Sequence, residues 1–165
     1  MRLVEVNLEN CQRALELAKK HLEQSDAPKY IKKIGKSISP VFLFDTKKKK
    51  YLGEAWAVSE RCHDIVRLHY GIVASKFKTK RIKQRNYFLI ITMFPNAFTA
   101  WGKTRRSYLN QVIFHEFSHL LDICARKQIA GNWSVASKDV DHDEHWQKIS
   151  RWCGATKGAH ASGTI

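Results

Sequence analysis

The run HEFSH at residues 115–119 constrains this chain most, because it sets two histidines four residues apart with a glutamate directly after the first. On an α-helix, positions i and i+4 lie one above the other, so both imidazoles can reach a single metal ion. Glu116 then lies beside the coordination position that water fills, where a carboxylate can accept a proton. The run therefore predicts a helix that presents His115 and His119 as metal ligands and Glu116 as general base.

The residues around this run have the periodicity of a helix packed into a core. Neither Gly nor Pro occurs between Gly102 and Gly131. Ser107 or Thr104 is expected to cap the start of the helix. Two core histidines without a metal are the alternative, but burying an unpaired Glu116 beside them would be costly. The apolar positions, three and four residues apart, are Leu109, Val112, Ile113, Phe117, Leu120, Leu121 and Cys124.

A third ligand is expected in the stretch DVDHDEHW at residues 139–146. Four of the 15 acidic residues of the chain fall within six positions here, which is also typical of a helix N-terminus capped by Asp141. The candidate ligands are His142 and His145. The apolar residues that would dock this second helix on the core are Trp146, Ile149 and Cys153.

The two stretches HEFSHLLD and HDEHW resemble those of the SprT-like metallopeptidases, the group that includes the Spartan protease. In that family, HExxH is followed after a variable spacer by a histidine and then, four residues on, by Phe or Trp at the start of a helix. The resemblance covers about residues 40–155. The residues that match the zinc ligands of the family are His115, His119 and His142.

The resemblance implies a zinc endopeptidase with one zinc ion, acting on proteins associated with DNA. Glu116 matches the catalytic base of the family, and Trp146 matches its packing aromatic residue. His145 is the rival third ligand. The chain departs from the family pattern at Asp143, where family members often carry Gly, and it lacks the paired CxxC motifs of a zinc ribbon.

Asp122 is a candidate partner of the metal ligands. It follows His119 by three residues, so it lies on the same side of the predicted helix. We expect its carboxylate to hydrogen-bond a ligand imidazole, as outer-shell carboxylates commonly do. A surface carboxylate at the flank of the helix is the alternative.

The order of predicted elements indicates a single α+β domain over residues 1–165. An N-terminal helix capped by Asn7 precedes a three- to four-stranded, mainly antiparallel sheet. The HExxH helix and the second ligand-bearing helix follow, and the sheet packs behind them in a zincin-like arrangement. An edge strand beside the metal would be the natural place for a peptide to add as a further strand. The predicted segments are a helical stretch at 29–36, a hairpin of strands 41–44 and 52–58, a third strand at 64–75, a doubly covered strand at 87–94 and a loosely held tail at 154–165.

The charge of the chain is its second informative feature. The formal net charge is +14, and thirteen of the 29 Lys and Arg residues occupy three stretches without acidic residues, at 47–50, 76–85 and 103–106. Turns and strand ends of this kind would form a basic rim for salt-sensitive binding to phosphates, and Trp56, Trp101 and Phe77 could stack on exposed bases. Solubilising turns that protect sheet edges are the alternative. The residues expected to bind nucleic acid, with single-stranded or distorted DNA favoured, are Lys78, Lys80, Arg81, Lys83 and Arg85.

Two functional classes stay open on the sequence. The first is the zinc endopeptidase, and the second is a zinc-stabilised nucleic-acid-binding module with little or no proteolysis. A closed structural site commonly adds a cysteine ligand, and none of the four cysteines has a convincing ligand spacing. The chain has neither an apolar run long enough to span a membrane nor a secretory signal, so we expect an intracellular protein, cytoplasmic or associated with DNA.

Overall fold

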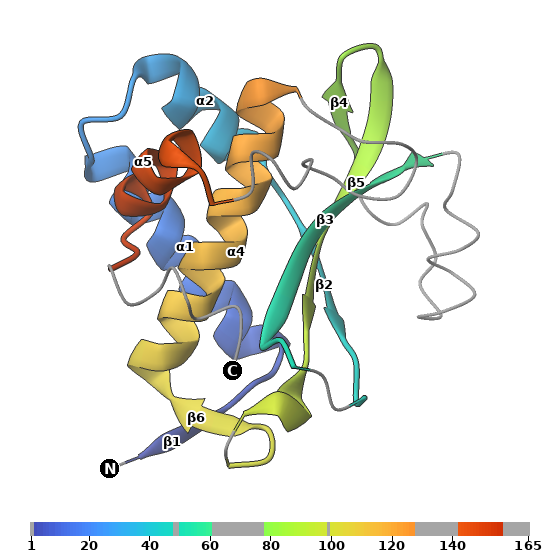
Figure 1. The fold of residues 1–165 in the computed structure, drawn as a ribbon, viewed down its shortest axis with the longest axis vertical. Coiled ribbons are helices and arrows are strands. Elements are labelled where there is room, and N and C mark those ends of the chain that lie inside the picture. Colours follow the sequence, from blue (N-terminus) through green and yellow to red (C-terminus); the bar gives the residue numbers. More distant parts are fainter. Residues whose placement is uncertain (1, 48–49, 61–77, 99, 128–141, 157–165) are drawn as a thin grey trace.

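Helices pack against one face of a four-stranded sheet in the computed structural model of the chain (Figure 1), which describes residues 2–47, 50–60, 78–98, 100–127 and 142–156. The α+β class predicted from the sequence is therefore confirmed. In chain order the elements are β1 (Leu3–Glu5), α1 (Leu8–Gln24), α2 (Lys29–Ser37), β2 (Val41–Phe44), β3 (Gly53–Ser59), β4 (Lys80–Ile82), β5 (Arg85–Met93), a short 3-10 helix (Pro95–Ala97), β6 (Lys103–Arg105), α4 (Arg106–Arg126) and α5 (Glu144–Trp152).

The N-terminal helix α1 follows the sequence prediction closely. The side chain of Asn7 accepts a hydrogen bond from the backbone N–H of Asn10 at 2.9 Å, so Asn7 is the N-cap. The next helix, α2, covers the helical stretch predicted at 29–36. The inner face of α1 consists of the buried residues Cys11, Ala14, Leu15, Ala18 and Leu22.

The strand β5 is the centre of the sheet, with β3 antiparallel on one side and β2 parallel on the other. The predicted hairpin of residues 41–44 and 52–58 is therefore wrong, because β5 lies between these two strands. The connection from β2 to β3 passes the end of β5, where Asp45 N donates to Met93 O at 2.9 Å and Phe94 N donates to Leu52 O at 3.0 Å. A central position suits β5 because its apolar residues must be buried on both faces.

Alternate residues of β5 pack into two separate cores. Leu89 and Ile91 belong to the large core that the sheet shares with the helices. Phe88 and Ile90 belong to a smaller core on the opposite face, with residues of β2 and β3. The prediction of a strand covered on both faces is confirmed.

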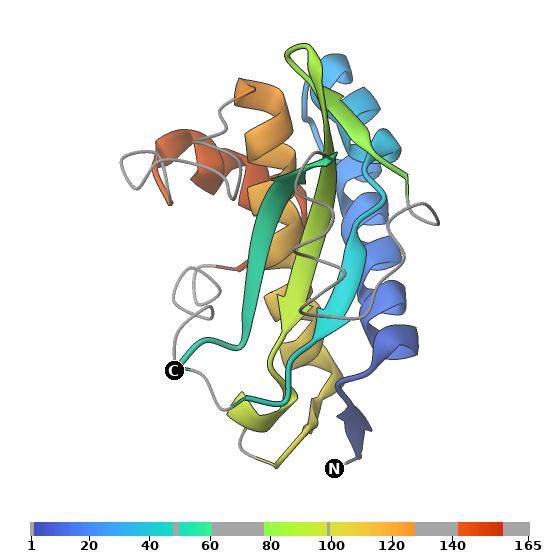
Figure 2. The same cartoon turned by 90° about the vertical axis from the view of Figure 1, so that its right-hand side faces the viewer.

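The helix α4 lies between the sheet and the other helices; Figure 1 shows the helices beside the sheet, and Figure 2 looks onto the sheet with the helices behind it. All the apolar positions predicted for its packing face are buried. Its start differs from the prediction, because Arg105 is the N-cap and no side chain caps the helix. Thr104 does not cap the helix, because it is buried in β6 and pairs with Val4 of β1.

Three further strands are not predicted from the sequence. The strands β1 and β6 form a separate antiparallel pair, and β4 pairs with the start of β5. The predicted strand at 64–75 lies outside the described residues, as does most of the predicted tail. Of the helices in the described part of the chain, none combines the length and the hydrophobicity that crossing a bilayer requires.

Candidate metal centre

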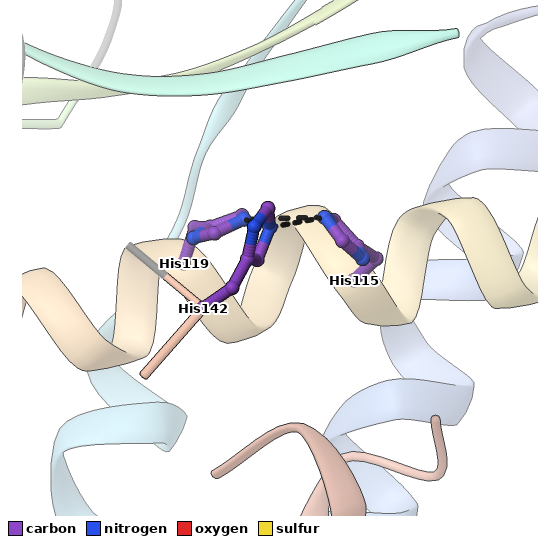
Figure 3. Close-up of side chains that lie close together, drawn as sticks. All are labelled: His115, His119 and His142. Carbon is purple, nitrogen blue, oxygen red and sulfur yellow. Dashed lines mark hydrogen bonds between the residues drawn. The ribbon is translucent and has the colours of Figure 1, made fainter. Parts of the chain in front are cut away.

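Three histidines converge at the junction of α4 and α5 (Figure 3). His115 and His119 lie one turn apart on α4, and His142 lies just before α5 in the chain. The Nε2 atoms are 3.2 Å apart between His115 and His119, 3.0 Å between His119 and His142, and 3.1 Å between His142 and His115. The structure thus brings together the three residues predicted as metal ligands.

Hydrogen bonding among the three rings cannot account for this triangle. A ring nitrogen of a neutral imidazole either carries a proton and donates, or carries a lone pair and accepts. Three nitrogens in a triangle cannot alternate between two roles, so at least one pair would oppose two donors or two lone pairs. A cation between them removes the conflict, because all three nitrogens can then direct lone pairs at it.

The dimensions and protonation of the group also suit a metal ion. In a tetrahedral site with metal–nitrogen bonds of about 2.0–2.1 Å, ligand nitrogens lie roughly 3.3–3.4 Å apart, close to the 3.0–3.2 Å found here. Burial lowers the pKa of His119 well below its ordinary value of 6.5, and the neighbouring imidazoles of His115 and His142 lower it further. Neutral imidazole is the form that binds metals, so this group can hold a metal ion.

Trp146 packs against all three imidazoles. Its ring stacks on that of His119 with a centroid distance of 4.9 Å and an interplanar angle of 24°. The rings of His115 and His142 meet it edge-on, with centroids at 4.9 and 4.6 Å. Trp146 is fully buried, so the first turn of α5 fixes one side of the histidine cluster.

Glu116 is buried on α4 and faces β3. Only 3% of its surface is exposed, and a Cβ atom added at Gly53 of β3 would lie 3.4 Å from its Cγ. A methyl group on Gly53 would therefore be in van der Waals contact with the side chain next to His115. In Figure 3 the same strand runs alongside α4, near the three rings.

Asp122 does not contact a ligand imidazole, and the rival ligand His145 does not join the histidine cluster. Asp122 was expected to contact a ligand imidazole, but its Oδ1 lies 2.7 Å from Arg126 Nε and 2.6 Å from Nδ1 of His145. The rival ligand His145 is thus paired with Asp122, while His142 joins His115 and His119. The reason is geometric, since α5 starts beside the last turn of α4 and brings His145 to Asp122.

Arg126 and Asp143 form an ion pair beside the histidine cluster that the sequence did not predict. Asp143, not Asp141, is the N-cap of α5. The hydrogen bonds from Arg126 lower the pKa of the Asp143 carboxyl to about 2. The four-residue spacing of Asp122 and Arg126 is a recognisable helix pair, but it does not reveal the third member on another helix.

The residues expected to bind nucleic acid lie on the hairpin of β4 and β5. Lys80 is half-buried and its Nζ donates to the Ser37 hydroxyl at the end of α2. The stretch at 103–106 forms β6 and the first residue of α4, at the opposite end of the sheet from the hairpin (Figures 1 and 2). The prediction that these basic stretches form one rim is therefore wrong. The four exposed basic residues of the hairpin are Lys78, Arg81, Lys83 and Arg85.

The three aromatic residues proposed for base stacking differ in accessibility. Trp101, near the stretch at 103–106, is 72% exposed. Trp56 is partly buried and donates from Nε1 to Thr92 Oγ1 at 2.9 Å, so it packs within the sheet. Phe77 lies outside the described residues.

Comparison with known proteins returns no matching family model, no matching curated protein and no matching solved structure.

The packing of Trp146 predicts a large effect of its removal. In urea unfolding without metal, Trp146→Ala should lower the free energy of unfolding by about 3–5 kcal/mol, because it leaves a large cavity beneath the three imidazoles. The exposed Trp101 is the matched control. Trp101→Ala should change the free energy of unfolding by less than about 0.5 kcal/mol. Equal effects of the two substitutions would contradict the role of Trp146 as the packing partner of the cluster.

Proposed function

We propose that the protein is a zinc-dependent endopeptidase related to the SprT-like metallopeptidases. The observation that carries this proposal is the triangle of Nε2 atoms from His115, His119 and His142, with the buried carboxylate of Glu116 one residue from a ligand. Three imidazole ligands with a position left open are typical of catalytic zinc sites. The resemblance of both motifs to the SprT-like pattern supports the same assignment.

The residues of the site divide the chemistry between them. Zinc held by these residues would supply Lewis acidity, which would lower the pKa of a coordinated water to about 7 and polarise the scissile carbonyl. The imidazoles of His115, His119 and His142 would hold the ion. Glu116 takes the proton of the attacking water and returns it to the leaving amine.

The position of β3 supports a peptide substrate. This strand packs against α4, and a Cβ atom added at its first residue, Gly53, would lie 3.4 Å from Glu116 Cγ. A side chain at this position would crowd Met93 Sδ at 3.3 Å and Glu116 Cγ at 3.4 Å. We infer that an extended substrate lies along β3, which brings one of its carbonyl groups to the open coordination position.

The alternative function is a zinc-stabilised nucleic-acid-binding module with little or no proteolysis. Glu116 argues against it, because a purely structural site has no use for a buried carboxylate beside a ligand. The two proposals differ in one measurable property, since only the peptidase requires Glu116 for its activity.

We further propose that nucleic acid binds the hairpin of β4 and β5. Its exposed basic residues project from a short hairpin at one end of the sheet. Lys83 adopts a positive φ of 54° in the tight turn, so the charges on both sides of the turn are held close together. Single-stranded or distorted DNA is the expected ligand, and proteins bound to that DNA are the expected substrates.

The first prediction concerns metal binding. The purified chain should bind one zinc ion, and His142→Ala should weaken binding more than 100-fold, beyond the 10–100-fold that loss of an outer-shell partner costs. His145→Ala is the matched control and should weaken binding less than about tenfold. Titration against a competing chelator measures both affinities. Loss of zinc from His145→Ala with retention by His142→Ala would make His145 the ligand.

The second prediction separates binding from chemistry. Glu116→Gln keeps the size of the side chain but cannot accept a proton, so zinc binding should persist while casein cleavage falls about 10²–10⁴-fold. Glu144→Gln, at an exposed carboxylate in the first turn of α5, is the control and should cleave normally. Undiminished cleavage by Glu116→Gln would eliminate the proposed mechanism.

The third prediction concerns nucleic acid. Changing Lys78, Lys80, Arg81 and Lys83 to Glu should abolish most binding of single-stranded DNA and flatten its salt dependence, by about 0.7–0.9 in slope for each lost phosphate contact. Zinc content should not change. A control with the same change in net charge replaces four basic residues of α1 and α5. These are Arg13, Lys20, Lys148 and Arg151.

The comparison of these two variants decides the location of the binding surface. Fluorescence anisotropy over a range of salt concentrations measures both affinity and slope. Equal losses in the two variants would mean that net charge alone attracts the DNA, and the hairpin would then be no specific surface.

A further inference from the structure

A cluster of four polar side chains joins the end of α4 to the start of α5. Asp122 and Arg126 come from α4, while Asp143 and His145 come from α5 and its N-cap. Arg126 Nη1 donates to Asp143 Oδ2 at 2.7 Å, and its Nη2 donates to the other oxygen of the same carboxylate. Arg126 Nε donates to Asp122 Oδ1 at 2.7 Å. One guanidinium thus bridges carboxylates of two elements.

The burial of this cluster shows that its contacts are more than a surface ion pair. The side chain of Asp122 is 3% exposed and that of Arg126 is 15% exposed, while that of Asp143 is 30% exposed. A two-pronged contact between a guanidinium and a carboxylate fixes both distance and orientation. Lysine cannot reproduce this contact, because its ammonium group is a single point of charge.

Asp143 is in turn fixed to α5. Its Oδ1 accepts a hydrogen bond from the backbone N–H of Trp146 at 3.0 Å, so the carboxylate that Arg126 holds also caps this helix. The same first turn carries the tryptophan against which the three imidazoles pack.

His142 directly precedes Asp143 and depends on its placement. The backbone of His142 has a φ of 59°, in the left-handed region that residues other than glycine seldom adopt. Such a conformation persists when the surrounding structure holds it in place. The contacts with Arg126 and with Trp146 N fix Asp143, the residue directly after His142. They thereby direct the His142 ring toward His115 and His119.

We propose that Arg126 is a positioning residue of the metal centre. From the end of α4 it binds the Asp143 carboxylate, and this contact holds the third ligand, His142, in place for the metal ion. This inference depends on the metal site proposed above and adds a residue to it. Arg126 acts through Asp143 and His142. It is therefore distinct from the Asp122 contact to a ligand that the sequence suggested.

The test is the zinc affinity of the full-length chain, measured by competition with a chelator. Arg126→Ala should weaken zinc binding about 10–100-fold, the range for losing an outer-shell partner, and Arg126→Lys should recover only part of this loss. Asp143→Asn should weaken it similarly, although asparagine is an equally good N-cap. Arg13→Ala removes an exposed arginine paired with Glu9 and should have no effect.

A double-mutant cycle distinguishes positioning from a general effect on stability. If Arg126 acts through the third ligand, Arg126→Ala should have no further effect on zinc affinity in a His142→Ala background. An equal loss in both backgrounds would overturn the proposal. If Arg126→Ala does not fold, because Asp122 is left buried without its cation, Arg126→Lys and Asp143→Asn decide the question by the same cycle.

The outcomes also separate this inference from the proposed function. A wild-type chain that binds no zinc would overturn the metal site itself. A wild-type chain that binds zinc, with Arg126→Lys and Asp143→Asn binding equally tightly, would overturn the role of Arg126 alone.

Discussion

The convergence of three imidazole nitrogens is the arrangement on which the rest of this account depends. Nitrogens 3.0–3.2 Å apart in a triangle cannot all be paired by hydrogen bonds among themselves. The fold nevertheless holds them there by three separate means. The periodicity of α4 aligns His115 with His119, Trp146 supports the rings from one side, and the ion pair of Arg126 with Asp143 fixes the chain beside His142.

The chemistry proposed for the site follows from what surrounds this triangle. The lowered pKa of His119 favours the neutral imidazole that binds a cation, and the buried carboxylate of Glu116 can accept a proton from water. The strand β3 borders the same region. A metal, a base and a strand along which a peptide can lie are the parts that a zinc endopeptidase requires.

The sequence predicted what local periodicity determines. The buried face of α1, the packing face of α4 and the pair of histidines on it all follow from the spacing of residues within one helix. The central position of β5 followed from its length and its apolar composition. The motif at 142–146 indicated His142 through its resemblance to a known pattern, although spacing alone left His145 equally eligible.

What the sequence could not provide was the pairing of elements distant in the chain. The strands β2 and β3 look like a hairpin because only a short lysine-rich turn separates them, yet β5 lies between them. Asp122 lies on the expected side of α4, but its partner was misassigned because the position of α5 cannot be read from spacing. The basic stretches were grouped into one rim for the same reason, although β4 and β6 lie at opposite ends of the sheet.

The most direct test of the central claim is an anomalous difference map at the zinc absorption edge, from crystals of the zinc-loaded chain. We expect one peak at about 2.0–2.1 Å from a ring nitrogen of each of His115, His119 and His142, with one coordination position left to water. A peak ligated by His145 in place of His142, or the absence of a peak between the three rings, would contradict it.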